Sequence, residues 1–356
     1  MANRLKTILT LFSKNNTESY WLDKAESILS ECIKLCRLYN NGYVTFLELH
    51  KLVTDINYYY SKIKILKQKF INCEFSICQV NDLLTSIEFF EKEFFCLDTR
   101  TSSILKSEIT RITNCFISDY DVKKIFCSPK QDLNFTGFQN VIENGEIVVL
   151  NMNLSEYKNL SKIIAAYLKL DFQSEVMSRL SNRTSNQSRS VCFISDEYHE
   201  YVTDTDATFY SQSREAKCIN IVATQSYTSL LNALNNQYSV QVIVQNLINK
   251  LWFRTDDTFT IEDAQKQIGK EEKRKSSHSI SENSKETKYN YFTKLFSARD
   301  ANISESINTY TQLDYVYDSN FFTRDLKTFS CLAFLSTGSS IIPPQKLILK
   351  PYFLSD

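Results

Sequence analysis

The stretch VCFISDE, residues 191–197, decides how the fold of this chain is interpreted. Its first four residues are apolar, which is the pattern of a short strand buried on both faces of a parallel sheet. Two adjacent acids, Asp196 and Glu197, follow that strand directly. Because ligands of open α/β sheets bind outside the carboxyl ends of the strands, both acids are expected beside a ligand. A buried strand that ends in Asp-Glu at a surface loop is also common, so the stretch alone is a weak signal.

Around this stretch, short apolar runs alternate with helical patterns, which favours a parallel α/β sheet. The run IVVL at 147–150 follows a turn at 143–146 and predicts a second strand buried on both faces. Further strands are expected at 219–223, 250–254 and 330–335. Helices are expected at about 155–180, 206–216, after Gln225, at 240–248, and at 260–268, where Gly269 ends the helix.

The first 130 residues have a different sequence pattern, with apolar residues at helical spacing and few turn residues. Thr45 followed by Glu48 is a capping box that begins one of these helices. We therefore predict an all-α domain at 1–130 and an α/β domain at 131–356. Within the second domain, the charged, Ser-rich residues 270–290 predict a flexible solvated loop rather than a DNA-binding tract. A turn is expected at Pro343-Pro344.

Composition excludes several classes of protein. The chain has 356 residues, with 41 Lys plus Arg and 41 Asp plus Glu, so no overall positive charge argues for nucleic acid. No window reaches the roughly 20 apolar residues that span a bilayer, and we expect a cytoplasmic chain. A membrane anchor would then lie on a missing segment or on a partner. The ten cysteines form no CxxC pair, which favours buried thiols in a reducing compartment. Cys32 and Cys36 could begin a zinc site, but no His/Cys pair completes it.

Two polar positions after the acids are further candidates. Arg214 ends the helix that follows the acids and could reach a phosphoryl group bound to a neighbouring subunit. It could equally interact with the negative end of its own helix. Gln225 follows the next strand and could sense a phosphate or the attacking water. The alternative is that Thr224 or Ser226 simply caps a helix there.

Taken in order, these landmarks resemble the ATPase domain of conjugative coupling proteins, the TraG/TraD class of type IV secretion, which are relatives of the FtsK/HerA motors. The matching segments are 144–151, 193–197, 213–214, 223–226 and 250–257. The helical first part is similar to the all-α domain of that family, and residues 342–353 resemble its last strand. The resemblance covers most of the chain.

The resemblance implies ATP and Mg²⁺ as cofactors. Asp196 would bind Mg²⁺ through water, and Glu197 would be the catalytic base. Arg214 would act in trans as an arginine finger, and Gln225 would be the sensor. The family works as a hexamer of coupling subunits at the inner membrane. It moves single-stranded DNA with its relaxase toward a type IV secretion channel, and its all-α domain contacts relaxase or DNA.

One required motif of that family is missing. The phosphate-binding Walker A loop reads GxxxxGK[ST], and the five glycines of this chain stand at 42, 137, 145, 269 and 338, with no pair five apart. We therefore expect an incomplete RecA-like P-loop sheet with an exposed apolar face. The chain would be a truncated or split coupling ATPase that cannot hydrolyse ATP alone. Two alternatives remain: a non-catalytic adaptor that binds relaxase or DNA through the helical domain, and an unrelated α/β protein with chance acids.

Overall fold

The computed structural model describes residues 2–12, 19–152, 154–181, 188–283, 288–291, 295–297, 302–351 and 353. The chain forms two compact units. The first contains residues 1–225 and 230–246, and the second contains residues 226–229 and 247–356.

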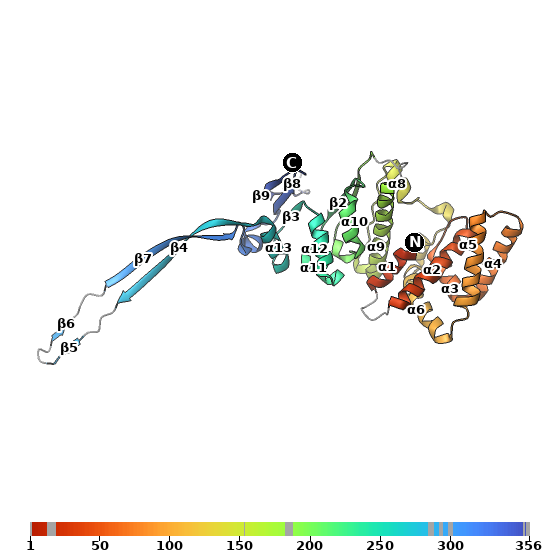
Figure 1. Cartoon of the computed structure of the whole chain (residues 1–356), viewed down its shortest axis with the longest axis horizontal. Helices are drawn as coiled ribbons and strands as arrows, with labels where there is room; N and C mark the ends of the chain where they lie inside the picture. The colour runs from red at the N-terminus through yellow and green to blue at the C-terminus, as the bar shows by residue number, and fades with distance from the viewer. Residues whose placement is uncertain are drawn as a thin grey trace. The chain divides into compact units, whose positions relative to one another are not determined.

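The first unit begins with the helical region that the sequence predicts (Figure 1). Thr45 and Glu48 form the expected capping box at the start of α3. The helices share one apolar core, in which the ring of Phe46 stacks on that of Phe116 at 3.9 Å between centroids. The elements are α1 (Ala2–Phe12), α2 (Ser19–Tyr39), α3 (Phe46–Thr54), α4 (Ile56–Ile71), α5 (Ile77–Glu88), the π-helix η1 (Phe89–Phe94), α6 (Thr99–Ile117), α7 (Tyr120–Phe126), the 3₁₀ helix η2 (Lys130–Asp132) and α8 (Phe138–Asn144).

Strands alternate with helices from α9 onward, as the sequence predicts. The elements are α9 (Leu154–Ser181, with a break at Lys158), β1 (Val191–Ser195), the 3₁₀ helix η3 (Tyr198–Glu200), α10 (Thr205–Ser213), β2 (Cys218–Val222), α11 (Tyr227–Leu234) and α12 (Gln237–Asn246). β1 and β2 pair in parallel, with Val191 opposite Cys218 and Ser195 opposite Val222. This pair confirms the parallel α/β character of the segment that contains the two acids.

The run at 147–150 is not the buried strand that we expected. It has no strand pairing in the described structure, and the side chains of Ile147 and Val149 are 89% and 80% exposed. A β-branched run forms a strand only when a neighbour satisfies its backbone groups. The described part of the chain supplies no such neighbour, so this apolar segment remains in solvent.

The second unit has a small antiparallel sheet rather than an extension of a parallel one. Its elements are β3 (Lys250–Trp252), α13 (Thr258–Ile268), β4 (Lys270–Asn283), β5 (Lys288–Asn290), β6 (Leu295–Ser297), β7 (Asn302–Tyr315), the π-helix η4 (Phe321–Asp325), β8 (Ser330–Ser336) and β9 (Ile341–Ile348). The order in the sheet is β3-β8-β9, and both pairings are antiparallel. Two predicted strands therefore exist, but their direction differs from the expectation. Gly269 ends α13 at φ 95°, as predicted.

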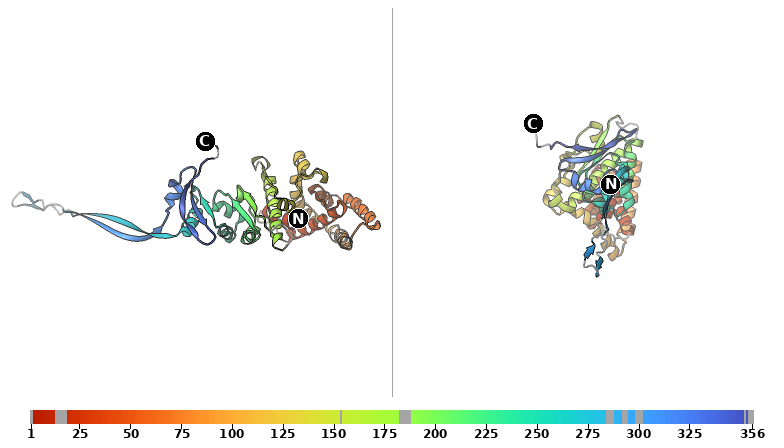
Figure 2. Two further views of the ribbon diagram at one scale, coloured as in Figure 1. Left: turned by 90° about the horizontal axis from the view of Figure 1, so that it is seen from above. Right: turned by 90° about the vertical axis from the view of Figure 1, so that its left-hand side faces the viewer.

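The segment predicted as a flexible loop is mostly a strand. β4 pairs with β7 over 14 residues, and both strands run side by side in Figure 1 and in the left view of Figure 2. Composition suggested a loop because residues 270–283 are charged and polar. The partner strand compensates some of these charges: Lys275 lies 2.8 Å from Asp314, and the Lys270 ammonium lies over the Tyr315 ring. Residues 284–287 of the predicted loop lie outside the described residues.

Pro343 and Pro344 do not form the expected turn, because they belong to β9. The register of β8 and β9 shifts between Ala333 and Leu335, opposite these prolines. Proline has no N–H to donate, so it is tolerated at irregularities and on edge strands. β9 is the outer strand of its sheet, which accommodates both residues.

The cysteines only partly match the expectation of buried thiols. Four are buried, but Cys73, Cys78, Cys96 and Cys192 are exposed. Burial raises the pKa of the Cys36 thiol to about 12, and its sulfur lies 3.1 Å from the Tyr39 hydroxyl. Among the residues described, no cluster of three His, Cys, Asp or Glu side chains could hold a metal ion, and no helix is long and apolar enough to cross a membrane.

Candidate functional site

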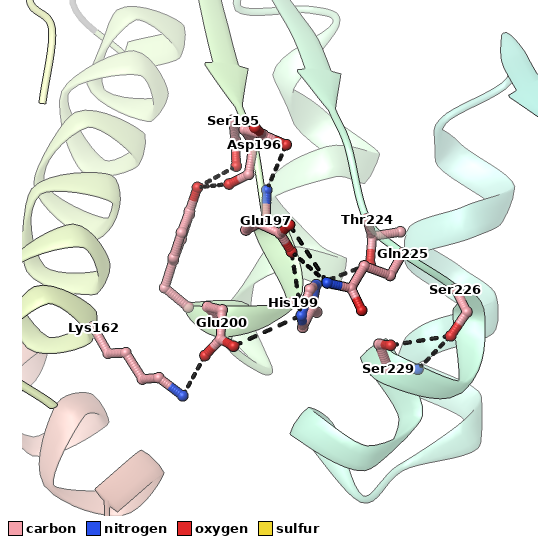
Figure 3. A network of polar contacts seen from close by, with 11 residues as sticks. Lys162, Ser195, Asp196, Glu197, His199, Glu200, Thr224, Gln225, Ser226 and Ser229 are labelled. Atoms are coloured by element: carbon pink, nitrogen blue, oxygen red, sulfur yellow. Dashed lines mark hydrogen bonds and ion pairs between the residues drawn. The ribbon is translucent and has the colours of Figure 1, made fainter. Parts of the chain in front are cut away.

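The candidate site lies where β1 and β2 end (Figure 3). Two backbone hydrogen bonds continue the pairing beyond the strands. The Ala223 N–H donates to the Ser195 carbonyl, and the Tyr198 N–H donates to the Ala223 carbonyl. They hold the turn after β1 against the turn after β2. Polar side chains from both turns are thereby brought to one edge of the sheet.

Glu197 and Gln225 meet at this edge, the place that the order of the strands predicts for both. The Gln225 Nε2 lies 3.3 Å and 3.5 Å from the two carboxylate oxygens of Glu197. The Glu197 side chain is 41% exposed, so it can contact both the protein and a ligand. Its backbone has φ 47° and ψ 41°, a left-handed conformation that costs a residue with a Cβ about 1–2 kcal/mol. Such strain concentrates at functional sites, where surrounding contacts maintain it.

Asp196 is exposed beside Glu197. Its Oδ1 accepts a hydrogen bond from the Glu197 N–H at 2.9 Å, which orients the carboxylate across the end of β1. The Tyr201 hydroxyl donates to the Asp196 carbonyl and lies 2.7 Å from the Ser195 hydroxyl. Burial raises the pKa of Tyr201, so its hydroxyl remains protonated and keeps the turn in place.

His199 is a member of this site that the sequence reasoning missed. Its Nε2 lies 3.5 Å from a Glu197 oxygen and 3.8 Å from Glu200, while its Nδ1 lies 3.3 Å from the Thr224 hydroxyl (Figure 3). The imidazole therefore joins the two turns beneath the acid. A histidine two residues after a paired acid was visible in the sequence, but its spacing matches no common motif.

A buried ion pair holds the segment that follows the acids, residues 198–206, against α9. The Lys169 ammonium of α9 lies 2.5 Å from Asp206, and both side chains are almost fully buried. Burial lowers the pKa of Lys169, while the neighbouring carboxylate opposes that change. Asp206 also accepts hydrogen bonds from Tyr198, Gln173 and Thr203. A carboxylate that is satisfied in this way ties the 198–206 segment rigidly to α9.

Arg214 is not brought to the acids of its own chain. It follows the last residue of α10 and is exposed, four residues before β2 begins. β2 begins opposite Val191, at the amino end of β1, whereas the acids follow the carboxyl end. Arg214 therefore lies at the opposite end of the strand pair. Any role for it in this chemistry would be toward a site on another subunit.

The carboxylate oxygens at this edge suit the metal ion of a magnesium nucleotide but do not suit its phosphates. Hard carboxylate oxygens such as those of Asp196 and Glu197 suit Mg²⁺ with its water shell. The β- and γ-phosphates require a loop of backbone N–H groups and a lysine, and the sequence contains no such loop.

Comparison with known proteins finds a family match for part of the chain. Residues 190–306 match the family model described as the TraM recognition site of TraD and TraG. This segment contains β1, the two acids, Gln225 and most of the β4–β7 hairpin. No curated protein is similar enough in sequence to count as a match to the chain.

Several solved structures share the fold. An unbound form of the bacterial conjugative coupling protein TrwB is 13% identical, with a TM-score of 0.57. The match covers 98% of this chain and 68% of that one. TrwB with ADP and Mg²⁺ gives the same values, and TrwB with a non-hydrolysable ATP analogue is 15% identical, with a TM-score of 0.56. At these identities the likeness shows a common fold.

The fold gives the broad class: the chain has a helical region followed by an α/β part that shares the RecA-like fold of TrwB. Residues 190–306, which contain the two acids, are similar to a segment of the TraD and TraG proteins. The whole chain shares the fold of the conjugative coupling protein TrwB.

Proposed function

We propose that this chain is the acid-bearing portion of a coupling ATPase that drives DNA transfer, with Glu197 as the base that activates water. The observation that carries the proposal is the contact between Glu197 and Gln225 at the carboxyl ends of two parallel strands. A carboxylate held by an amide at this edge is suited to orienting a water for attack on a phosphoryl group. Asp196, one residue before, would hold Mg²⁺ through its water shell.

Arg214 would act on the site of a neighbouring subunit. Its exposure at the far end of the strand pair supports this role, because it leaves the guanidinium available to a second copy. From the resemblance to the TraG/TraD class we further infer that the chain assembles into a hexameric ring. Its cargo would be a relaxase with its single-stranded DNA, and its partner would be a secretion channel. An arginine finger supplied in trans is worth roughly 10³–10⁵ in rate where it has been measured.

Our first prediction concerns the isolated chain. It should release no phosphate from Mg·ATP above background, because nothing in its sequence neutralises and positions the β- and γ-phosphates. A malachite-green assay of the purified chain measures this directly. The matched control is Glu197→Gln, which should give the same background value. Turnover by the isolated chain that Glu197→Gln abolishes would show that these 356 residues contain a complete site.

A further inference from the structure

The two strands β4 and β7, which we call the β4–β7 ribbon, have outer edges of different character. In the part of the chain that the structure describes they pair only with each other, so each strand has one outward row of backbone N–H and C=O groups. Proteins protect such open edges with charged residues, lysine above all, or with proline. β4 has this protection, because residues 270–275 read KEEKRK. Its edge is therefore poorly suited to binding a further strand.

The edge of β7 lacks this protection. Residues 305–315 read ESINTYTQLDY, with two acids, no basic residue, no proline and no glycine. The β-branched and aromatic residues among them favour a strand. Ile307, Tyr310 and Leu313 are 59%, 48% and 60% exposed. A long exposed edge with these residues is the kind of strand to which another strand adds.

The apolar side chains of β7 have no apolar neighbour across the ribbon. Side chains alternate along a strand, so Ile307 and Leu313 share one face. On that face His278 lies opposite Ile307, and Glu272 lies opposite Leu313. Apolar pairs across neighbouring strands stabilise a sheet. A strand added to the outer edge of β7 could supply the apolar partners that β4 does not.

A second copy of β7 has the sequence that supplies these partners. Consider two β7 strands that pair antiparallel about a twofold axis at Tyr310. Residues equally far from Tyr310 on its two sides then lie opposite each other. Ile307 of each copy faces Leu313 of the other, and Thr309 faces Thr311. Each apolar residue thereby gains an apolar neighbour, and each threonine gains a threonine, which is a favourable cross-strand pair.

The same register also places the acids of β7 favourably. Glu305 lies opposite Tyr315 of the second copy, and Asp314 lies opposite Ser306. Both hydroxyls can donate a hydrogen bond to the carboxylate that faces them, and no two acids are opposed. An axis one residue earlier, at Thr309, would instead place Glu305 opposite Leu313. The sequence of β7 is therefore complementary to itself in one particular register.

We propose that β7 pairs antiparallel with β7 of a second copy of this chain, with Tyr310 on the twofold axis. A contact of this kind uses the same surface on both copies. The resulting four-stranded sheet has β4 at both outer edges, where the charged residues 270–275 oppose the addition of further strands. The contact therefore joins copies in twos. It goes beyond the proposed function and does not depend on it.

Disulfide crosslinking of the purified full chain tests the proposal. The four exposed cysteines are first replaced by serine: Cys73, Cys78, Cys96 and Cys192. Opposed residues of an antiparallel pair have Cα atoms about 4.5 or 5.5 Å apart, which suits a disulfide. We therefore expect Tyr310→Cys to form a covalent dimer on mild oxidation. The matched control is Ser277→Cys, an exposed position of β4 opposite Asn308, which should remain monomeric on a denaturing gel.

A second pair of variants tests the register. Asn308 and Gln312 lie equally far from the proposed axis, on opposite sides of it. Asn308→Cys mixed with Gln312→Cys should give a mixed dimer that mass spectrometry identifies, whereas neither variant should crosslink alone. A disulfide of Asn308→Cys with itself would place the axis elsewhere and would overturn the proposed register.

A charge on the β7 edge should prevent the contact. Ile307→Lys in the Tyr310→Cys chain should lower the dimer yield at least tenfold. The matched control is Ile280→Lys on β4, which is 67% exposed on the same face of the ribbon and should leave the yield unchanged. Both side chains are exposed, so neither thermal unfolding curve should move. Absence of the Tyr310→Cys dimer, an equal yield from Ser277→Cys, or oligomers that form without the Tyr310→Cys crosslink would overturn the proposal.

Discussion

At the scale of single residues, the candidate site depends on an acid in a conformation that favours glycine. Glu197 keeps φ at 47° because the Tyr198 N–H is bonded to the Ala223 carbonyl and the Tyr198 hydroxyl is bonded to Asp206. The following residue is therefore fixed by a backbone contact and by a buried carboxylate. This anchoring aims the Glu197 carboxylate at Gln225, and a carboxylate that is placed beforehand loses little entropy when it binds a water.

The strain at Glu197 predicts an unusual order of stability. The free energy of unfolding of Glu197→Gly should exceed that of Glu197→Ala by about 0.5–1 kcal/mol. Alanine has a Cβ, which is disfavoured in the left-handed region, and glycine has none. This difference is smaller than the cost of the left-handed conformation because glycine has greater conformational freedom in the unfolded chain. Both variants remove the same carboxylate, so lost contacts cancel. Urea unfolding followed by circular dichroism measures the difference, and an alanine variant at least as stable as the glycine variant would argue against strain.

At the scale of elements, the turn after β1 depends on the link between α9 and α10. The Lys169–Asp206 pair is the centre of that link, with the two side chains 1% and 0% exposed. Removing one member of a buried pair leaves the other charge without compensation, which costs about 3–5 kcal/mol. The hydrogen bonds to Asp206 from three further residues make this pair part of a network rather than an isolated contact.

Lys169→Met should therefore lower the free energy of unfolding by at least about 3 kcal/mol. Adding Asp206→Asn removes the orphaned charge and keeps an acceptor for Tyr198, so the double variant should recover more than about 1 kcal/mol. Thermal and urea unfolding of the three proteins give these values. If the double variant were less stable than Lys169→Met alone, the uncompensated charge of Asp206 would not be the cause of the lost stability.

The elements also show what local sequence could and could not predict. The runs at 147–150 and 191–194 have the same apolar pattern, yet only the second is a strand, because β2 lies beside it. Likewise, residues 270–283 have the composition of a loop but pair with 302–315, which lie far along the chain. Periodicity and composition describe one segment at a time, whereas strand formation depends on a partner elsewhere. The helices needed no such partner information, and they were predicted well.

At the scale of the whole molecule, the candidate site was predictable in part. Asp196, Glu197 and Gln225 could be proposed together because parallel strands present their carboxyl ends at one edge. His199 could not be found from the sequence, since only the fold places its ring between Glu197 and Thr224. The spacing of the five glycines predicted that these residues contain no Walker A loop, and it could not predict that Ile194, Ile219 and Ile221 are exposed on β1 and β2.

The most direct measurement of the central claim is the frequency of conjugative DNA transfer from cells in which the chain carries Glu197→Gln. If Glu197 is the base of a coupling ATPase, its loss should slow hydrolysis by about 10²–10⁴ and lower transfer by a comparable factor. The matched control is Glu215→Gln, an exposed acid that follows α10 at the far end of the strand pair. Transfer at the unsubstituted frequency with Glu197→Gln, at equal protein levels, would contradict the account.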